Sequence, residues 1–320
     1  MKHLKRLAII LSILGILIIV LIFIPKSKFD RENPFLAKDG MPLVMAHAGG
    51  KGVYPDNTMA AYLYSFNLGV DVLEMDVQLT ADHVLVLLHG QNDTGNTIEH
   101  SNLDTVVWEE TYDYLYQNGN FGYNYQEEDG SYLYRDMTST EWQAAHVYLP
   151  TLEEVFETFG DQVLYNIEIK ADADAPREDT ADALHDLIVA YELEDYVLVA
   201  TAFEDIGNYI LENYPDLFLS TNYASAQDYV ISAYTLTTLF KSKPLYAGMQ
   251  VPTSYDLPVI NTLRLDTRLL IHTLHQQHMA MHYWTINDEE TMRFLIKQGA
   301  DGIITDYPAL LMQIIDELSA

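Results

Sequence analysis

The chain has 320 residues, of which 49% are hydrophobic and 20% are charged, enough for one large domain or two small ones with a sizeable core. Seventeen basic and 47 acidic residues give a formal net charge of −30, which argues against a large surface for nucleic-acid phosphates or anionic lipids. The sequence contains no cysteine, which excludes disulfides, thiolate metal sites and a cysteine nucleophile. A metal site would therefore need carboxylate and histidine ligands.

The N-terminus carries an unbroken apolar run over residues 7–24. At about 1.5 Å per residue, a helix over this run would be roughly 27 Å long, which just crosses the core of a bilayer. Three basic residues precede the run, and residues 22–26 lack the small residues of a signal-peptidase site. We therefore expect residues 1–24 to be an uncleaved transmembrane anchor, with a cleaved signal peptide as the alternative.

The basic residues around this run do not fix its orientation, because Lys26, Lys28 and Arg31 balance the three basic residues that precede it. The rest of the chain is strongly acidic and free of cysteine. This composition suits the outer face of a bacterial membrane. We therefore expect a single-pass protein whose folded domain lies outside the cell.

Residues 25–42 contain prolines, a glycine and mixed charges, which is typical of a linker. From residue 43 onward, strand-like segments alternate with helix-like ones, and this alternation predicts an α/β fold of the (β/α)8 TIM-barrel type over residues 43–320. The eight expected strands are Leu43–Ala46, Val72–Leu79, Val163–Lys170, Tyr196–Thr201, Leu217–Thr221, Ala247–Val251, Met279–Ile286 and Gly302–Thr305.

Two helix starts and one insertion stand out between these strands. Thr151, followed by Glu154, has the pattern of a capping box, and Asn57 is the expected N-cap of a helix that runs through Phe66. Residues 103–150 are too long and irregular for an ordinary connection. We expect this insertion to lie over the barrel mouth, where packing of its eight tyrosines on the rim is favoured over contact with a substrate.

Acidic side chains alternate with apolar ones along two expected strands. In the segment 73–77, outward packing of the three apolar residues turns Glu74 and Asp76 toward the barrel axis. The strand ending at residue 170 places Glu168 and Lys170 on the same inner side. Carboxylates gathered there repel one another unless a cation lies between them. A buried ion-pair network is the alternative for one pair, and agreement between two strands favours a site at the C-terminal end of the barrel.

Two histidines are expected at the same end of the barrel. His47 follows the first strand, and His89 follows the apolar segment 84–88. Imidazole titrates near neutral pH, so both are candidates for acid–base work. The four histidines between residues 272 and 282 fall where a helix passes into a strand, and we expect them to serve packing or solvent contacts rather than metal binding.

Together these residues form an ordered set of motifs over nearly all of residues 43–318. They resemble the glycerophosphodiester phosphodiesterase family, whose pattern is a His-Arg pair, a Glu-x-Asp and a further histidine on a barrel. The resemblance rests on His47 with Gly49 and Gly50, Pro55-Asp56-Asn57-Thr58, Glu74-Met75-Asp76, His89, Pro150-Thr151-Leu152-Glu153-Glu154, Ile167-Glu168-Ile169-Lys170, Trp284-Thr285-Ile286-Asn287-Asp288 and the segment 301–308.

The resemblance implies hydrolysis of glycerophosphodiesters to glycerol 3-phosphate and an alcohol. It implies that Glu74, Asp76 and Glu168 hold Mg²⁺ or Ca²⁺, both of which accept oxygen ligands. In the family's mechanism the neighbouring glycerol hydroxyl attacks phosphorus, and water then opens a cyclic phosphate. His47 is assigned as the base and His89 as the acid. Lys170 and Trp284 would contact the substrate.

Two positions depart from the family's pattern. Ala48 stands where arginine usually follows the first histidine, and Gly90 stands where aspartate usually follows the second. A membrane-tethered protein that only binds a phosphate ligand would explain Ala48, but it would not explain the two histidines. A second alternative is a lysophospholipase D-like phosphodiesterase that acts on lipids, which an apolar rim around the barrel mouth would favour.

Overall fold

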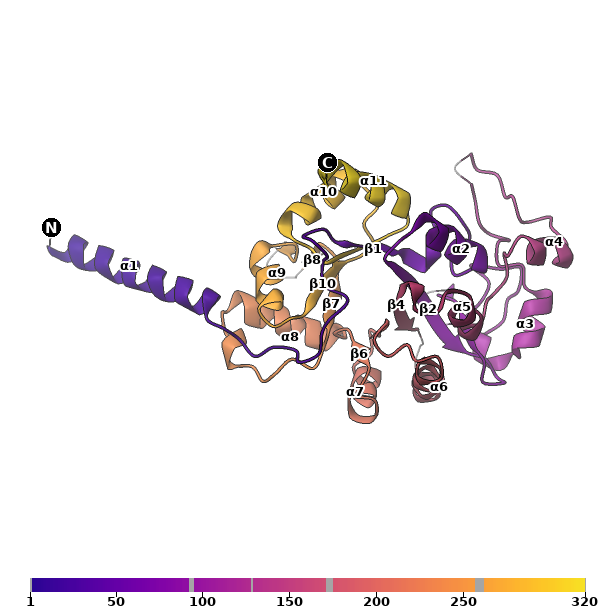
Figure 1. Ribbon diagram of the computed structural model, residues 1–320, viewed down its shortest axis with the longest axis horizontal. Helices are drawn as coiled ribbons and strands as arrows, with labels where there is room; N and C mark the ends of the chain where they lie inside the picture. Colours follow the sequence, from indigo (N-terminus) through magenta and orange to yellow (C-terminus); the bar gives the residue numbers. More distant parts are fainter. Residues whose placement is uncertain (1, 92–94, 128, 171–174, 257–261, 320) are drawn as a thin grey trace.

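The computed structural model describes residues 2–91, 95–127, 129–170, 175–256 and 262–319. Residue 1 of the expected anchor and residue 128 of the expected insertion therefore lie outside the described residues. Helices surround a central set of strands, and the N-terminal helix α1 (Lys2–Phe23) extends away from it (Figure 1). The parallel strands are β1 (Leu43–Ala46), β2 (Val72–Leu79), β4 (Leu164–Ile169), β5 (Val197–Ala200), β6 (Phe218–Leu219), β7 (Gly248–Val251), β10 (Ala280–Tyr283) and β11 (Gly302–Thr305).

These eight strands form a TIM-type barrel. Their order is β6-β5-β4-β2-β1-β11-β10-β7, and a parallel bridge between Ser220 and Gly248 brings the two outer strands together. The eight strands expected from the sequence are thus present, each within a few residues of its expected bounds. The surrounding helices are α2 (Met59–Leu68), α5 (Leu152–Phe159), α6 (Arg177–Ala190), α7 (Glu204–Asn213), α8 (Tyr223–Tyr234), α9 (Arg268–His275), α10 (Glu289–Gln298) and α11 (Pro308–Ser319).

Smaller elements complete the described chain. Strand β3 (Leu85–Leu87) pairs antiparallel with β2, and β8 (Ser254–Asp256) forms a hairpin with β9 (Thr262–Arg264). Within residues 103–150 lie helices α3 (Tyr112–Asn118) and α4 (Ser139–Ala144) and the 3₁₀ turn η3 (Val107–Glu109). Three further 3₁₀ turns are η1 (His47–Gly49), η4 (Gly160–Gln162) and η5 (Thr238–Phe240).

The alternation of side chains along the strands divides the core into two layers. Outward residues of β2, such as Met75 and Val77, pack with helix residues in one large cluster. A second cluster fills the N-terminal end of the barrel, where Phe29 and Phe35 from the segment before β1 pack against strand residues. The segment 25–42 therefore closes this end of the barrel, and the opposite, C-terminal end remains for a site.

The expected transmembrane anchor is not supported by the structure. Among the described residues, none of the helices has both the length and the apolar character that crossing a membrane requires. Helix α1 ends at Phe23, and the charged residues Lys5 and Arg6 lie inside its first turns, which shortens its uncharged stretch.

The expected N-cap at Asn57 is also wrong. Helix α2 begins one residue later, with Thr58 as its N-cap, and the Thr58 hydroxyl accepts a hydrogen bond from the Ala61 amide. Asn57 has a left-handed backbone (φ 53°), and its side chain points to strand β2 instead. The expected start at Thr151 is confirmed, because its hydroxyl accepts a 3.0 Å hydrogen bond from the amide of Glu154 at the start of α5.

Candidate active site

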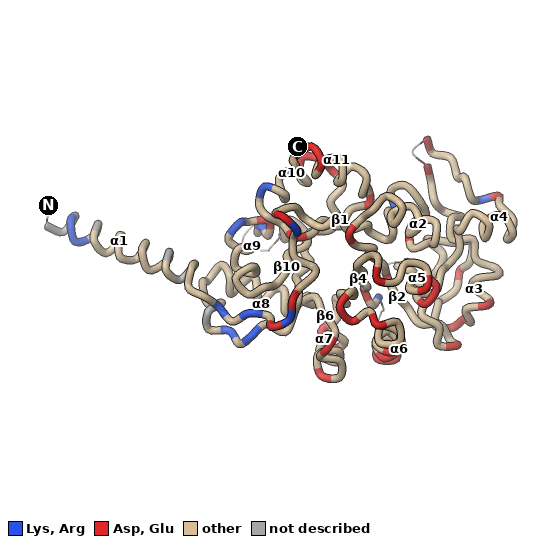
Figure 2. Tube along the Cα trace, in the orientation of Figure 1, with Lys and Arg blue, Asp and Glu red and all other residues tan. Residues whose placement is uncertain are grey.

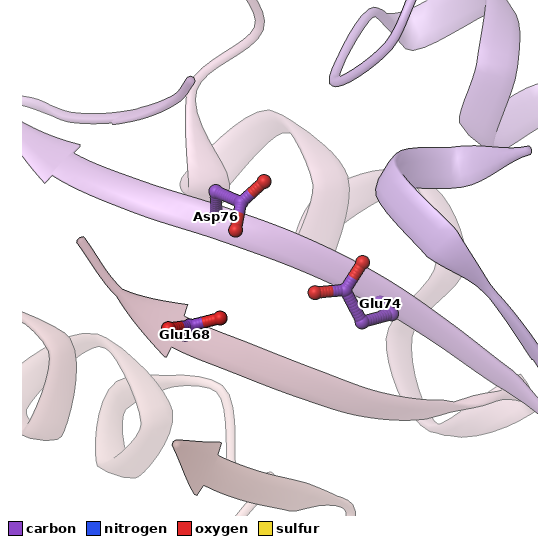
Figure 3. A group of neighbouring side chains, drawn as sticks. All are labelled: Glu74, Asp76 and Glu168. Carbon is purple, nitrogen blue, oxygen red and sulfur yellow. The ribbon is translucent and has the colours of Figure 1, made fainter. Parts of the chain in front are cut away.

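Three carboxylates meet inside the C-terminal part of the barrel. Glu74 and Asp76 project from β2, and Glu168 projects from the neighbouring strand β4 (Figure 3). The strand register pairs Asp76 with Glu168, and one oxygen from each of the three residues lies within 4.8 Å of the others. The expectation that these three side chains face inward together is therefore correct.

The two carboxylates on β2 have opposite electrostatic surroundings. Burial and the negative charge of Asp76 raise the pKa of Glu74 to about 7. Burial also acts to raise the pKa of Asp76, but the ammonium of Lys170, 3.6 Å away, outweighs it and lowers that pKa. Lys170 also lies 3.1 Å from Glu168. This lysine therefore supplies positive charge to two of the three carboxylates.

His47 lies at the end of β1 in the turn η1, next to the carboxylates. Its Nδ1 lies 2.6 Å from Oδ1 of Asp306, which follows β11. Burial acts to lower the pKa of His47, but the negative charges of Glu74 and Asp306 outweigh burial and raise it to about 9. Because Asp306 holds Nδ1, Nε2 is the nitrogen of His47 that is left for proton exchange.

His89 follows β3, and its ring is fixed on two sides. Its Nδ1 lies 2.9 Å from the carbonyl oxygen of Gly90, so Nε2 is again the nitrogen left for chemistry. The amide of Gln78 on β2 donates hydrogen bonds to the carbonyls of Leu88 and His89 at 2.9 and 3.3 Å. The structure therefore places both predicted histidines at the end of the barrel where the carboxylates lie.

Sequence analysis did not predict a third histidine near this site. The ring centroid of His100 lies 6.2 Å from that of His89, and its Nδ1 is 3.1 Å from Asp56. Its Nε2 is buried and has no hydrogen-bond partner within the described residues. Asp56 belongs to the motif 55–58, but no local pattern marks His100, which comes from the irregular chain after β3.

Asn57 and Asp306 were quoted only as parts of motifs, and their contacts explain why they are there. The Asn57 side-chain amide donates to Asp76 at 2.9 Å, and its oxygen accepts from the buried hydroxyl of Tyr62 at 2.7 Å. Asp306 accepts a second hydrogen bond, 2.7 Å long, from Asn287. Both residues therefore fix a neighbouring functional side chain.

The other predicted residues divide into two groups. Trp284 follows β10 and is 45% exposed, at the same end of the barrel as the carboxylates. His275 and His282 lie elsewhere: His275 contacts Asp301 at 2.7 Å, and buried His282 contacts the Phe35 carbonyl at 2.9 Å. Both serve the packing of the N-terminal end, as expected.

The two departures from the family's pattern have local structural explanations. The Ala48 amide donates a 2.6 Å hydrogen bond to Glu74, and Ala48 is buried with φ 47°. Gly90 has φ 77°, and a Cβ placed there would lie 2.7 Å from the amide nitrogen of Gly95. The backbone at position 90 therefore has no room for a side chain.

The donor set of the three carboxylates fits a hard divalent cation. Glu74 and Asp76 are 4% and 1% exposed, so water screens their mutual repulsion poorly. Oxygen ligands of this kind suit Mg²⁺ and Ca²⁺. Glu74, Asp76 and Glu168 are thus the residues that would hold the ion.

Comparison with known proteins gives one consistent family. The glycerophosphoryl diester phosphodiesterase family matches residues 47–310. A glycerophosphodiester phosphodiesterase of Bacillus altitudinis is 26% identical over 280 residues, which cover 87% of this chain and 100% of the relative. Human lysophospholipase D is 23% identical over 312 residues, which cover 91% of this chain and 90% of the relative.

A solved structure supports the same fold. A phosphodiesterase of Oleispira antarctica, determined in complex with its product sn-glycerol-3-phosphate, matches with a TM-score of 0.62 and 19% sequence identity. The match covers 86% of this chain and 97% of that one. At this level of identity the similarity establishes the barrel fold.

Proposed function

The chain belongs to the glycerophosphoryl diester phosphodiesterase family and is a phosphoric diester hydrolase, and from this premise we propose that it hydrolyses glycerophosphodiesters to glycerol 3-phosphate and an alcohol in a metal-dependent reaction. The observation that carries the proposal is the meeting of His47, His89 and the carboxylates of Glu74, Asp76 and Glu168 at one end of the barrel.

The two histidines would move the protons of the reaction. In our proposal Nε2 of His47 accepts the proton of the attacking glycerol hydroxyl, because Asp306 keeps Nδ1 occupied. Nε2 of His89 donates a proton to the departing alcohol, because Nδ1 faces the Gly90 carbonyl. Each role follows the general pattern of a fixed imidazole in acid–base catalysis.

Positive charge beside the phosphoryl group is the second requirement. A divalent cation held by Glu74, Asp76 and Glu168 would stabilise the charge that grows on the phosphoryl oxygens. Lys170 would add to this charge from the same side, since its ammonium lies between Asp76 and Glu168. Neutralising Glu74 would also lower the pKa of His47 toward its ordinary value and so favour the neutral base.

The direct test is an assay of the full-length protein with glycerophosphocholine and detection of glycerol 3-phosphate. We expect product formation that requires Mg²⁺ or Ca²⁺ and stops on chelation. His89→Gln should remove the activity, and His83→Gln, a change of the same type four positions before β3 ends, should not. Binding of the diester without any turnover would support the alternative of a non-catalytic phosphate-binding protein.

Lysophospholipids are the second candidate substrate class. The similarity to human lysophospholipase D over 91% of this chain supports this candidate. The same assay with a lysophosphatidylcholine and detection of choline and lysophosphatidate tests it.

Two organisational features also remain proposals. We propose that residues 43–320 form the catalytic unit after segments 1–24 and 25–42, with residues 103–150 inserted over the barrel mouth. The effect of Tyr54 and Tyr307 on the pKa of Tyr125, which burial chiefly raises to about 12, supports this place for the insertion. We further propose an extracellular location, supported by the acidic, cysteine-free composition. Protease treatment of intact cells tests the location.

A further inference from the structure

Four large aromatic side chains are exposed around the C-terminal end of the barrel. Tyr223 follows β6, Tyr255 lies in β8 after β7, Trp284 follows β10 and Tyr307 follows β11. Their exposed fractions are 57%, 42%, 45% and 38%, respectively. Because β6, β7, β10 and β11 are neighbours in the barrel, these residues stand on consecutive loops. We call the four residues the aromatic arc.

Contacts connect the members of the aromatic arc to one another and to the site. The hydroxyls of Tyr223 and Tyr255 are 2.6 Å apart, with their ring centroids at 6.1 Å. The amide of Trp284 donates to the Val251 carbonyl at 3.3 Å, which ties the Trp284 loop to the end of β7. At the other end of the arc, a Cβ on Gly52 would lie 2.5 Å from the Tyr307 ring. Tyr307 therefore packs against the loop that begins at His47.

The position of the arc decides which part of a substrate it meets. In the barrel order, β7 and β10 lie across the axis from β2 and β4, which carry the carboxylates. His47 lies between the carboxylates and the arc, on β1 next to β11. Since His47 is the proposed base for the glycerol hydroxyl, the glycerol half of a diester points toward the arc. The departing alcohol points toward His89 on the other side.

The chemistry of the arc suits an apolar chain at a wet rim. Tyrosine and tryptophan present an apolar ring with a polar tip, which lets them remain exposed and still cover alkyl groups. The nearest guanidinium on the β8–β9 hairpin, Arg264, is held by Asp266 in hydrogen bonds of 2.7 and 2.6 Å. In Figure 2 the basic segments gather where α1 meets the barrel and around α9, not along β2 and β4.

We propose that the aromatic arc binds the acyl or alkyl chain on the glycerol of a lysophospholipid, so that chain-bearing diesters are better substrates than glycerophosphocholine. This inference rests on the proposed function and names its substrate class. An apolar rim is also the feature that the sequence left open for a lysophospholipase D-like activity.

The test measures kcat/KM of the full-length protein for glycerophosphocholine and for lysophosphatidylcholines with short chains that remain monomeric. We expect kcat/KM to rise with chain length by up to about fourfold for each methylene that is buried. Tyr223→Ser combined with Tyr255→Ser should flatten this rise and leave glycerophosphocholine unchanged. Tyr223→Phe combined with Tyr255→Phe keeps the rings and should keep the rise.

Phe240→Ser is the matched control. Phe240 is 80% exposed, but it lies in η5 before β7, at the opposite end of the barrel. An equal rise with chain length in the Tyr→Ser double variant would overturn the inference, and so would an equal loss for glycerophosphocholine.

Binding to the inactive variant His89→Gln separates this inference from the proposed function. Calorimetry with the same lysophosphatidylcholines should show affinity that rises with chain length and falls in the Tyr→Ser double variant, whether or not the wild-type protein turns over any diester. Chain-independent binding would contradict the arc as a chain site.

Discussion

Asp306 holds Nδ1 of His47 at 2.6 Å although 259 positions separate the two residues in the chain. The contact forms because β1 and β11 are neighbours in the barrel, with Ala46 paired to Thr305. Asn287 in turn contacts Asp306 through both of its side-chain atoms, at 2.7 and 2.9 Å. Three loops at the C-terminal end of the barrel thus fix the orientation of one imidazole.

Asp306→Asn is expected to lower kcat by roughly 10²-fold, in the range that positioned acid–base groups contribute, with a smaller effect on KM. An asparagine amide at this position would favour the wrong tautomer of His47. Steady-state kinetics with glycerophosphocholine measures the effect. Asp288→Asn is the control, because Asp288 only caps α10 and asparagine is an equally good N-cap. Equal kinetics for wild type and Asp306→Asn would show that His47 needs no partner.

Glu168→Gln is expected to abolish divalent-ion binding and activity together, and to leave the fold intact. Glu168 is the most accessible of the three carboxylates, with 27% of its side chain exposed, so its loss leaves no newly buried charge. Calorimetric titration with Mg²⁺ and Ca²⁺ measures the binding. Glu157→Gln on the outer face of α5 is the control. Unchanged metal affinity in Glu168→Gln would remove this residue from the ligand set.

Gly90→Asp, which restores the family's usual residue, is expected to destabilise the protein and reduce kcat. The new Cβ meets the Gly95 backbone at 2.7 Å, and the left-handed backbone alone costs a non-glycine residue roughly 1–2 kcal/mol. The displaced backbone also carries the carbonyl that orients His89. Gly40→Asp has φ 80° and no atom within 4 Å of the added Cβ, so it isolates the backbone cost. Thermal unfolding should place the melting temperature of Gly90→Asp clearly below that of Gly40→Asp; the reverse order would refute the steric argument.

The contact between His275 and Asp301 predicts a pH-dependent stability. Burial acts to lower the pKa of His275, but the hydrogen bond to Asp301 outweighs it and raises the pKa above its ordinary value. The folded state therefore binds this proton more tightly than the unfolded state. The resulting stabilisation is complete below about pH 6.5, the unfolded pKa of histidine. It is lost as the pH rises through the folded pKa.

His275→Gln should accordingly lower the free energy of unfolding more at pH 6 than at pH 9. Urea unfolding at the two pH values measures this difference. The effect is expected to be modest, because the His275 side chain is 38% exposed and water screens the pair. The control His278→Asn changes an exposed histidine with φ 58°, where asparagine tolerates the backbone. A loss of stability in His275→Gln that is independent of pH would contradict the assignment.

The sequence by itself determined the barrel and most of the site. Strand bounds and the inward direction of Glu74, Asp76 and Glu168 follow from a two-residue alternation that any β-strand imposes on its side chains. His47 and His89 were predictable because each directly follows an apolar strand, and in parallel barrels these strand ends converge. These features depend on neighbours in the chain, so local patterns are sufficient to reveal them.

Only the tertiary structure decided what holds and surrounds these residues. Asp306 reaches His47, and His100 reaches Asp56 and His89, through contacts between loops whose relative positions depend on barrel closure. Asn57 was misassigned as a helix cap because its preference for capping is local, whereas its hydrogen bond to Asp76 joins the start of α2 to β2. The aromatic arc is likewise invisible in the sequence, since its members are spread from Tyr223 to Tyr307 and become neighbours only when the strands that carry them close the ring.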